Sequence, residues 1–88
     1  MACYIISYDL RKPGRNYNAL YEAIKAYGTW AKINESLWAI VTQQTAAQVR
    51  EKLDQYIDAN DRIFVVKSGV EAAWRNCICR NDWLKKNL

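Results

Sequence analysis

The 88-residue sequence contains no histidine, a single proline and three glycines. Without an imidazole, Ser-His and Cys-His nucleophilic mechanisms and His-based acid–base catalysis are excluded. The apolar runs fall far short of the ~20 residues that a membrane-spanning helix needs, and the start of the chain lacks the pattern of a secretory signal. Any catalysis must therefore use carboxylates with a metal, or Lys or Tyr, and we expect a cytoplasmic protein that does not enter the membrane.

The cysteines are few and poorly spaced for zinc. Cys77 and Cys79 lie two residues apart and Cys3 is remote, an arrangement that matches no zinc-site spacing and leaves an odd thiol. We therefore expect reduced and mostly buried cysteines that behave as small apolar side chains.

What the chain does contain predicts one globular domain over residues 1–88. Apolar residues make up 51% of it, which is typical of a folded domain rather than a disordered tail. The net charge of +4 gives a mild bias toward acidic partners. The charge alone decides little, because many small domains are equally basic.

One stretch near the start of the sequence is the predicted centre of the fold. Residues 4–10 (Tyr-Ile-Ile-Ser-Tyr-Asp-Leu) form an apolar run that a Pro-Gly pair ends, a pattern that predicts a buried central strand. The strand would deliver Asp9 at its end, just before the basic residues Arg11, Lys12 and Arg15. This group of residues is a candidate functional site, because the carboxylate can hold a metal and the neighbouring cations can hold phosphate.

Apolar spacing predicts two helices. The first covers residues 16–27, with Asn16 as its N-cap and Gly28 as its C-terminal stop. The second covers residues 45–58 and begins with a capping box at Thr45. Strands are expected over residues 4–10, 29–33, 36–42 and 63–66, with a hairpin turn at Asn34-Glu35 between the second and the third.

This order of elements predicts an α+β, ferredoxin-like βαββαβ sandwich. A four-stranded antiparallel sheet would carry both helices on one face, with the first and fourth strands in the middle. The core would span residues 3–67. The segment 68–88 allows several alternatives: a helical turn over residues 70–77, a small edge strand at residues 77–79, and a final turn capped by Asn81.

The predicted strands are apolar on both faces, although two helices can cover only one of them. We favour a homodimer that packs partly through the sheets. The alternative is that the segment 68–88 folds back over the second face.

Several short stretches together resemble the CRISPR-associated protein 2 superfamily, which includes the virulence-associated protein D ribonucleases. They are the Tyr8-Asp9-Leu10 strand end, the helix that closes at Tyr27-Gly28, the Ser36-Leu37-Trp38 strand opening and the Asp61-Arg62-Ile63 strand entry. The resemblance lies in their order and spacing over about residues 3–67.

The resemblance implies a ferredoxin-like homodimer in which Asp9 of each chain faces the other near the two-fold axis and shares a divalent metal, Mg²⁺ or Mn²⁺. It also implies nucleic acid as a partner, with an integrase subunit or an antitoxin as a further protein partner. The sequence departs from the family at Asn34-Glu35, where members often carry Gln, and in its Trp-rich and Cys-rich end. These departures favour a divergent or stand-alone member.

Each candidate site has a structural alternative. Asp9 is either a catalytic metal ligand or a turn residue that accepts backbone N–H groups. The cations at Arg11, Lys12 and Arg15 either contact phosphate or belong to a solvated turn. Accessory hydroxyls could come from Ser7 and Ser36, and Glu35 is either a second acid or an exposed turn residue. We interpret the tyrosines and tryptophans mostly as core or interface residues. The remaining cations are interpreted as solvated: Arg75, Arg80, Lys85 and Lys86.

Two functional hypotheses follow. The first is a homodimeric, metal-dependent endonuclease that acts on RNA or DNA through Asp9. The alternative is a non-catalytic, nucleic-acid-binding or scaffolding homodimer of the same fold, such as a spacer-acquisition subunit.

Overall fold

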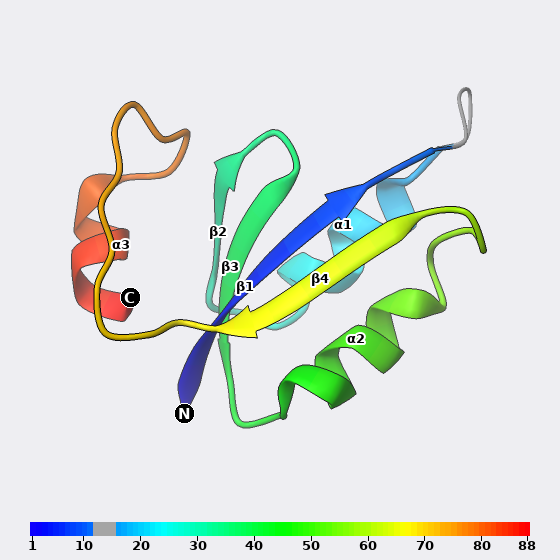
Figure 1. Cartoon of the computed structure of the whole chain (residues 1–88), viewed down its shortest axis with the longest axis horizontal. Helices are drawn as coiled ribbons and strands as arrows, with labels where there is room; N and C mark the ends of the chain where they lie inside the picture. The colour runs from blue at the N-terminus through cyan, green and yellow to red at the C-terminus, as the bar shows by residue number, and fades with distance from the viewer. Residues whose placement is uncertain (12–15) are drawn as a thin grey trace.

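The computed structural model describes residues 1–11 and 16–88 (Figure 1). Its elements are β1 (Ala2–Asp9), α1 (Asn18–Lys25), β2 (Trp30–Asn34), β3 (Leu37–Thr42), α2 (Ala46–Asp54), β4 (Arg62–Lys67) and α3 (Asn81–Asn87). The four strands form one antiparallel sheet, and α1 and α2 lie together on one side of it (Figure 1). The α+β, ferredoxin-like prediction is confirmed.

The strand order corrects one prediction. The sheet runs β2-β3-β1-β4, so β1 is central as expected, but β4 lies at an edge and β3 takes the second central place. Each of the two βαβ units skips one strand: α1 carries the chain from β1 past β3 to β2, and α2 carries it from β3 past β1 to β4. Two interleaved units of this kind leave β2 and β4 at the edges.

The helix boundaries differ from the prediction by a few residues. Asn16 Oδ1 accepts from the Asn18 backbone N–H at 2.8 Å, which makes a local turn before α1 rather than the N-cap itself. Gly28 adopts a φ of 87° just beyond α1, as expected of a residue that ends a helix. The capping box at Thr45 is confirmed, with Thr45 and Gln48 bonded reciprocally, but α2 ends at Asp54 rather than at residue 58.

The β2–β3 hairpin turns one residue later than predicted. Asn34 pairs with Leu37 beyond an irregularity in register after Lys32, so the turn falls on Glu35-Ser36. The extra residue in the strand explains the shift, because a bulge moves the end of the pairing along one strand only.

The main core lies between the sheet and the two long helices. It holds side chains from β1, β3, β4 and both helices, and the fully buried ones are closely packed. The side chains with no or almost no exposure are Ile6, Leu20, Ile24, Ile40, Val49 and Leu53.

The C-terminal segment 68–88 covers part of the second face of the sheet. Leu84 of α3 is 1% exposed and packs in a second cluster with Cys3, Ile33 and Ala39. The alternative in which the tail folds back is therefore confirmed, whereas the homodimer stays a prediction. Residues 70–80, all of them described, contain neither the helical turn nor the edge strand considered above. The final helix is present, but Asn81 is its first residue and Arg80 takes the N-cap position predicted for Asn81.

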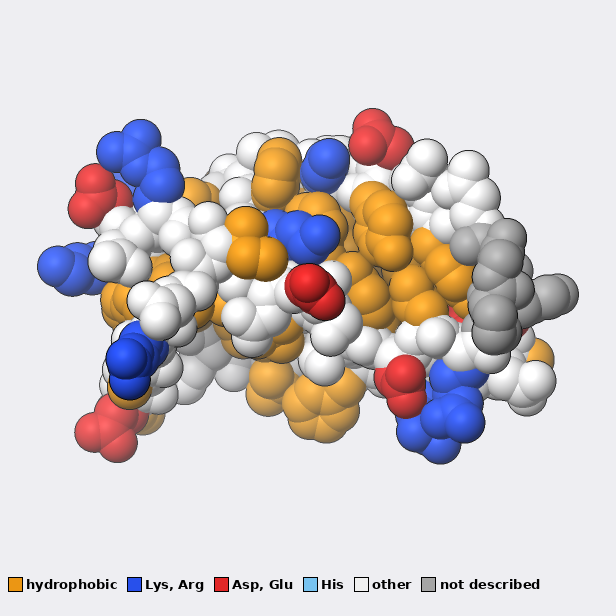
Figure 2. Space-filling model, turned by 90° about the horizontal axis from the view of Figure 1, so that it is seen from above, with side chains coloured by type: hydrophobic (Ala, Val, Ile, Leu, Met, Phe, Trp, Pro, Cys, Tyr) orange, Lys and Arg blue, Asp and Glu red, His pale blue; other side chains and the backbone are white. Residues whose placement is uncertain are grey.

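The tail leaves the β4 side of this face open. Phe64 is 64% exposed and Val66 is 42% exposed, and Figure 2 shows that apolar side chains also reach the surface in the view from above. No helix of the described ranges 1–11 and 16–88 is long and apolar enough to cross a membrane.

The cysteine prediction is confirmed for the most buried thiol. Cys3 is 8% exposed, and burial raises the pKa of its thiol above the usual value. Cys77 and Cys79 are half-buried in the C-terminal segment, and all three thiols are free.

Candidate functional site

Asp9 stands at the last position of β1, where the backbone register places it opposite Arg62 of β4. Arg62 Nη1 donates to Asp9 Oδ2 at 3.0 Å, and Arg11 Nη1 lies 3.5 Å from the same oxygen. The Asp9 side chain is 55% exposed, so solvent screens both ion pairs and each contributes little to stability. The site is therefore accessible, and its charges can exchange partners.

An open hollow of about 300 Å³ surrounds this carboxylate. Ser7 and Asp9 share the second face of the sheet because they lie two residues apart on one strand. Phe64 lies opposite Ser7 on β4. The hollow is lined by Ser7, Tyr8, Asp9, Arg62, Ile63 and Phe64.

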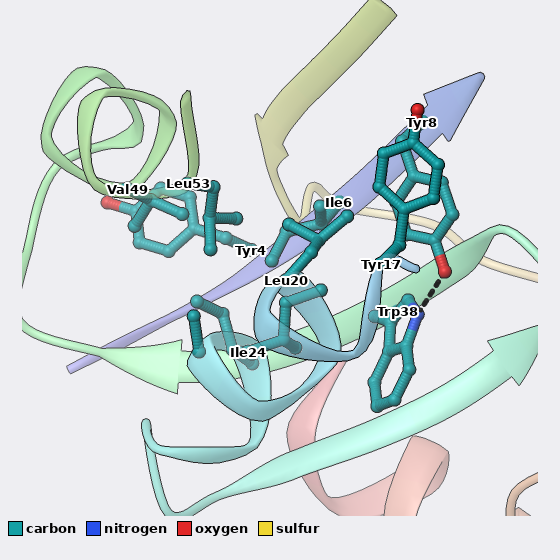
Figure 3. Close-up of a cluster of buried hydrophobic side chains, with 11 residues drawn as sticks. Tyr4, Ile6, Tyr8, Tyr17, Leu20, Ile24, Trp38, Val49 and Leu53 are labelled. Carbon is teal, nitrogen blue, oxygen red and sulfur yellow. Dashed lines mark hydrogen bonds between the residues drawn. The ribbon is translucent and has the colours of Figure 1, made fainter. Parts of the chain in front are cut away.

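Tyr8 points into the main core, on the opposite face of the sheet from Asp9, and holds the end of β1 in place from the core side. The Trp38 indole N–H donates to the Tyr8 hydroxyl at 2.9 Å (Figure 3), and that hydroxyl donates to the Glu35 carbonyl at 3.3 Å. Burial raises the pKa of Tyr8, although the bond from Trp38 acts in the opposite direction. Tyr8 is thus a neutral support for the site and not a base near pH 7.

Asp61 ties together three segments beside the site. Its carboxylate accepts from the Arg11 backbone N–H at 2.6 Å, from the Tyr17 hydroxyl at 2.8 Å and from the Asp58 backbone N–H at 2.8 Å. The segment after β1, the start of α1 and the turn before β4 are thereby held to one another. From the sequence, Asp61 was identified only as part of the entry to the last strand. The signal for its role was an aspartate three residues after another one, a spacing that favours side chain-to-backbone bonding in turns.

The structure brings together some of the predicted site residues. Asp9 and Arg11 meet, and Arg62 joins them although it was not predicted as a site residue, because only the β1–β4 register reveals it. Lys12 and Arg15 lie outside the described residues. Among the described residues, neither serine hydroxyl bonds to Asp9: Ser7 lies on its face, and Ser36 offers its carbonyl to the Tyr8 backbone N–H at 3.2 Å.

The donor set fits a weakly held Mg²⁺ or Mn²⁺ and not a closed protein cage. Within residues 1–11 and 16–88, no three His, Cys, Asp or Glu side chains gather as metal ligands. Asp9 therefore offers a single carboxylate, whose Oδ2 is engaged by arginines. Mg²⁺ usually keeps several waters and takes one or two carboxylates plus substrate phosphate, so the arrangement fits only when a second chain or a substrate supplies further oxygens.

The comparison with known families gives one finding. Residues 1–75 match the family model described as CRISPR associated protein Cas2. The match covers all six elements from β1 to β4, together with Asp9, Arg11, Asp61 and Arg62, and ends before α3.

Proposed function

The chain belongs to the CRISPR associated protein Cas2 family, and we propose that it works as a metal-dependent endonuclease whose site is completed by a second copy of the chain. The observation that carries this proposal is the exposed Asp9 carboxylate at the end of the central strand, with Arg62 and Arg11 within 3.0 Å and 3.5 Å of it. Such a group combines a metal ligand with phosphate-binding cations.

The arginines would bind the substrate's backbone. The Arg11 and Arg62 side chains are 47% and 69% exposed, so either guanidinium can turn from Asp9 to a phosphate oxygen at little cost. Guanidinium groups bind phosphate bidentately and without sequence preference. When bound at Asp9, Mg²⁺ or Mn²⁺ would supply Lewis-acid polarisation of the phosphate and a more acidic water.

A second copy would bring a second Asp9 to the site. The exposed Phe64 and Val66 lie on the same face of the sheet as Asp9, and an apolar surface beside a polar site is typical of a protein interface. A two-fold related copy would cover it with the same surface and double the number of carboxylates.

One observation favours a second candidate, a non-catalytic nucleic-acid-binding or scaffolding homodimer. The 3.0 Å pair with Arg62 neutralises the carboxylate on which the first proposal depends. In this case Asp9 orients Arg62 toward the phosphate backbone, and the action on nucleic acid belongs to a protein partner, such as an integrase subunit or an antitoxin.

Cleavage assays separate the two candidates. Single-stranded RNA and duplex DNA are incubated with Mg²⁺, Mn²⁺ or EDTA and with wild type, Asp9→Asn or the control Asp82→Asn, which changes an aspartate that is 85% exposed on α3. We expect metal-dependent cleavage that falls about 100-fold in Asp9→Asn and is unchanged in Asp82→Asn.

The other outcomes are equally informative. Equal cleavage by wild type and a folded Asp9→Asn variant would mean a contaminating nuclease. Binding without cleavage by wild type would establish the scaffolding role instead.

A further inference from the structure

A second hollow lies at the opposite edge of the sheet from Asp9. The Asp9–Arg62 pair belongs to the β1–β4 side, whereas this hollow borders β2, the other edge strand. Its volume is about 320 Å³, and α3 lies on this side of the sheet, away from β4 (Figure 1). We name it the Trp30–Trp83 pocket; it is lined by Trp30, Ala31, Lys32, Ile78, Cys79, Arg80 and Trp83.

The pocket is built by a fixed contact between the tail and the edge strand. The Ile78 backbone N–H donates to the Ile33 carbonyl at 2.9 Å, and Leu84 anchors α3 in the second apolar cluster. Both walls are therefore held in place, which reduces the ordering cost when a ligand enters.

Two tryptophans, from the two faces of the sheet at its β2 edge, are among the lining residues. Trp30 is 37% exposed, and its ring lies 5.5 Å from the ring of Trp38 at an angle of 50°. Trp38 thus supports Trp30 from the core side, and Trp83 lines the pocket from α3. A supported but accessible indole is a flat platform on which a planar ring can stack.

Cations surround these rings. Lys32 and Arg80 line the pocket, Lys25 Nζ lies 5.4 Å from the Trp30 ring centroid, and Lys86 lines an adjoining hollow that shares Arg80 and Trp83. The neighbouring acids are Glu22, 3.8 Å from Lys25, and Asp82, 3.8 Å from Arg80 and 85% exposed. The surroundings therefore carry a surplus of positive charge, and Figure 2 shows Lys and Arg side chains at the end of the molecule that the tail forms.

We propose that the Trp30–Trp83 pocket binds an unpaired nucleotide of a single-stranded nucleic acid, with the base stacked on the accessible Trp30 indole and the phosphate held by Arg80 and Lys32. A purely apolar ligand would leave the cations unused, and a simple anion would leave the two tryptophans unused. Stacking platforms flanked by cations are the common solution for single strands, and the volume suits one base rather than a duplex.

This pocket does not depend on cleavage at Asp9. It shares only the class of partner with the proposed function, and it uses the tail and the β2 edge instead of the β1–β4 end. Residues 76–88, which include Ile78, Arg80 and Trp83, lie beyond the matched family region, so the tail would add single-strand binding to the fold.

The test is a titration with short single-stranded oligonucleotides of DNA and RNA, in EDTA so that no metal-dependent cleavage occurs. Tryptophan fluorescence and the anisotropy of a labelled oligonucleotide report binding. We expect quenching by both oligonucleotides and affinity that falls about 5- to 100-fold in Trp30→Leu. Arg80→Ser should weaken binding several-fold and flatten its salt dependence, whereas the control Arg75→Ser, an exposed arginine that lines neither hollow, should bind as wild type does.

Three controls keep this test separate from stability and from the Asp9 site. Thermal melts verify folding. Because Trp30 contacts Trp38, Trp30→Met, which fills space without a flat ring, replaces Trp30→Leu if the latter unfolds. Arg80 is exposed enough to change safely. The EDTA in the titration removes the metal-dependent step at Asp9. A blunt duplex should bind wild type and Trp30→Leu equally, and equal oligonucleotide affinity of wild type and the folded Trp30 and Arg80 variants would overturn the proposal.

Discussion

At the scale of single residues, the site depends on the side chains that support the end of β1 as much as on Asp9. The Tyr8 hydroxyl receives the Trp38 indole N–H at 2.9 Å inside the main core. Removing the Tyr8 hydroxyl would leave the buried Trp38 indole N–H unsatisfied, at a cost of about 1–3 kcal/mol. Asp61 also supports the site, because its carboxylate accepts hydrogen bonds from three separate segments.

Burial of tyrosine hydroxyls predicts a loss of stability at high pH. Desolvation raises the pKa of Tyr8 and of Tyr27 in the folded protein, whereas the unfolded chain ionises near pH 10. The stabilising contribution is therefore complete below about pH 10 and is lost as the pH rises through the folded pKa values.

Urea unfolding as a function of pH measures this loss. The midpoint should fall above about pH 10, and it should fall less steeply in Tyr8→Phe, which lacks one of the two groups. The control is Val70→Ala, because Val70 is fully exposed and carries no titratable group, so its midpoint should fall as steeply as that of wild type. A midpoint that stays level across this range, in wild type and variants alike, would contradict this prediction.

At the scale of elements, Gly28 is a specific requirement of the α1–β2 connection. Its φ of 87° lies in a region that L side chains rarely adopt, although a Cβ there would meet no atom within 4 Å. The expected cost of Gly28→Ala is thus conformational, about 1 kcal/mol.

The chain supplies a matched control for this prediction. A Cβ at Gly69 would likewise meet no atom within 4 Å, but the φ of Gly69 is not positive, so Gly69→Ala should leave the unfolding midpoint unchanged or raise it slightly. Chemical denaturation of the two variants side by side measures the difference, and equal stabilities would show that the conformation of Gly28 matters little.

The elements themselves were largely predictable from the sequence, because spacing and caps are local signals. The helical spacing from Tyr17 to Tyr27 and the box at Thr45 located α1 and α2 to within a few residues. The place of β4 was not predictable in this way: an apolar run such as Ile63–Val66 indicates burial, but its neighbours in the sheet depend on how the two βαβ units interleave.

The candidate site was predictable only in part for the same reason. Asp9 could be identified as the acid at the end of a central strand, and Arg11 follows it in sequence. Arg62 is distant in the chain and meets Asp9 only through the β1–β4 register. The Trp30–Trp83 pocket also joins distant segments, so the tryptophans read individually indicated only core or interface positions.

At the scale of the whole molecule, the C-terminal segment covers part of the second sheet face. Leu84 is 1% exposed against Cys3, Ile33 and Ala39. We expect Leu84→Ala to destabilise the chain by about 2–4 kcal/mol, since it removes buried apolar volume that the sheet cannot refill.

Urea denaturation tests this role of the tail. The control is Val70→Ala, because Val70 belongs to the same segment but is fully exposed, and its change should have almost no effect. If Leu84→Ala were as stable as Val70→Ala, the tail would not be packed on the sheet in solution.

The sharpest test of a shared metal site at Asp9 is the number of divalent cations held per chain. Mn²⁺ binding is measured by titration calorimetry on wild type, Asp9→Asn and Asp82→Asn, with the molar mass determined in parallel. We predict one Mn²⁺ for every two chains, lost in a folded Asp9→Asn variant and kept in Asp82→Asn, because a single chain offers only one carboxylate at this site among its described residues. Mn²⁺ binding that is the same in wild type and Asp9→Asn, or that reaches one ion per monomeric chain, would contradict the shared site.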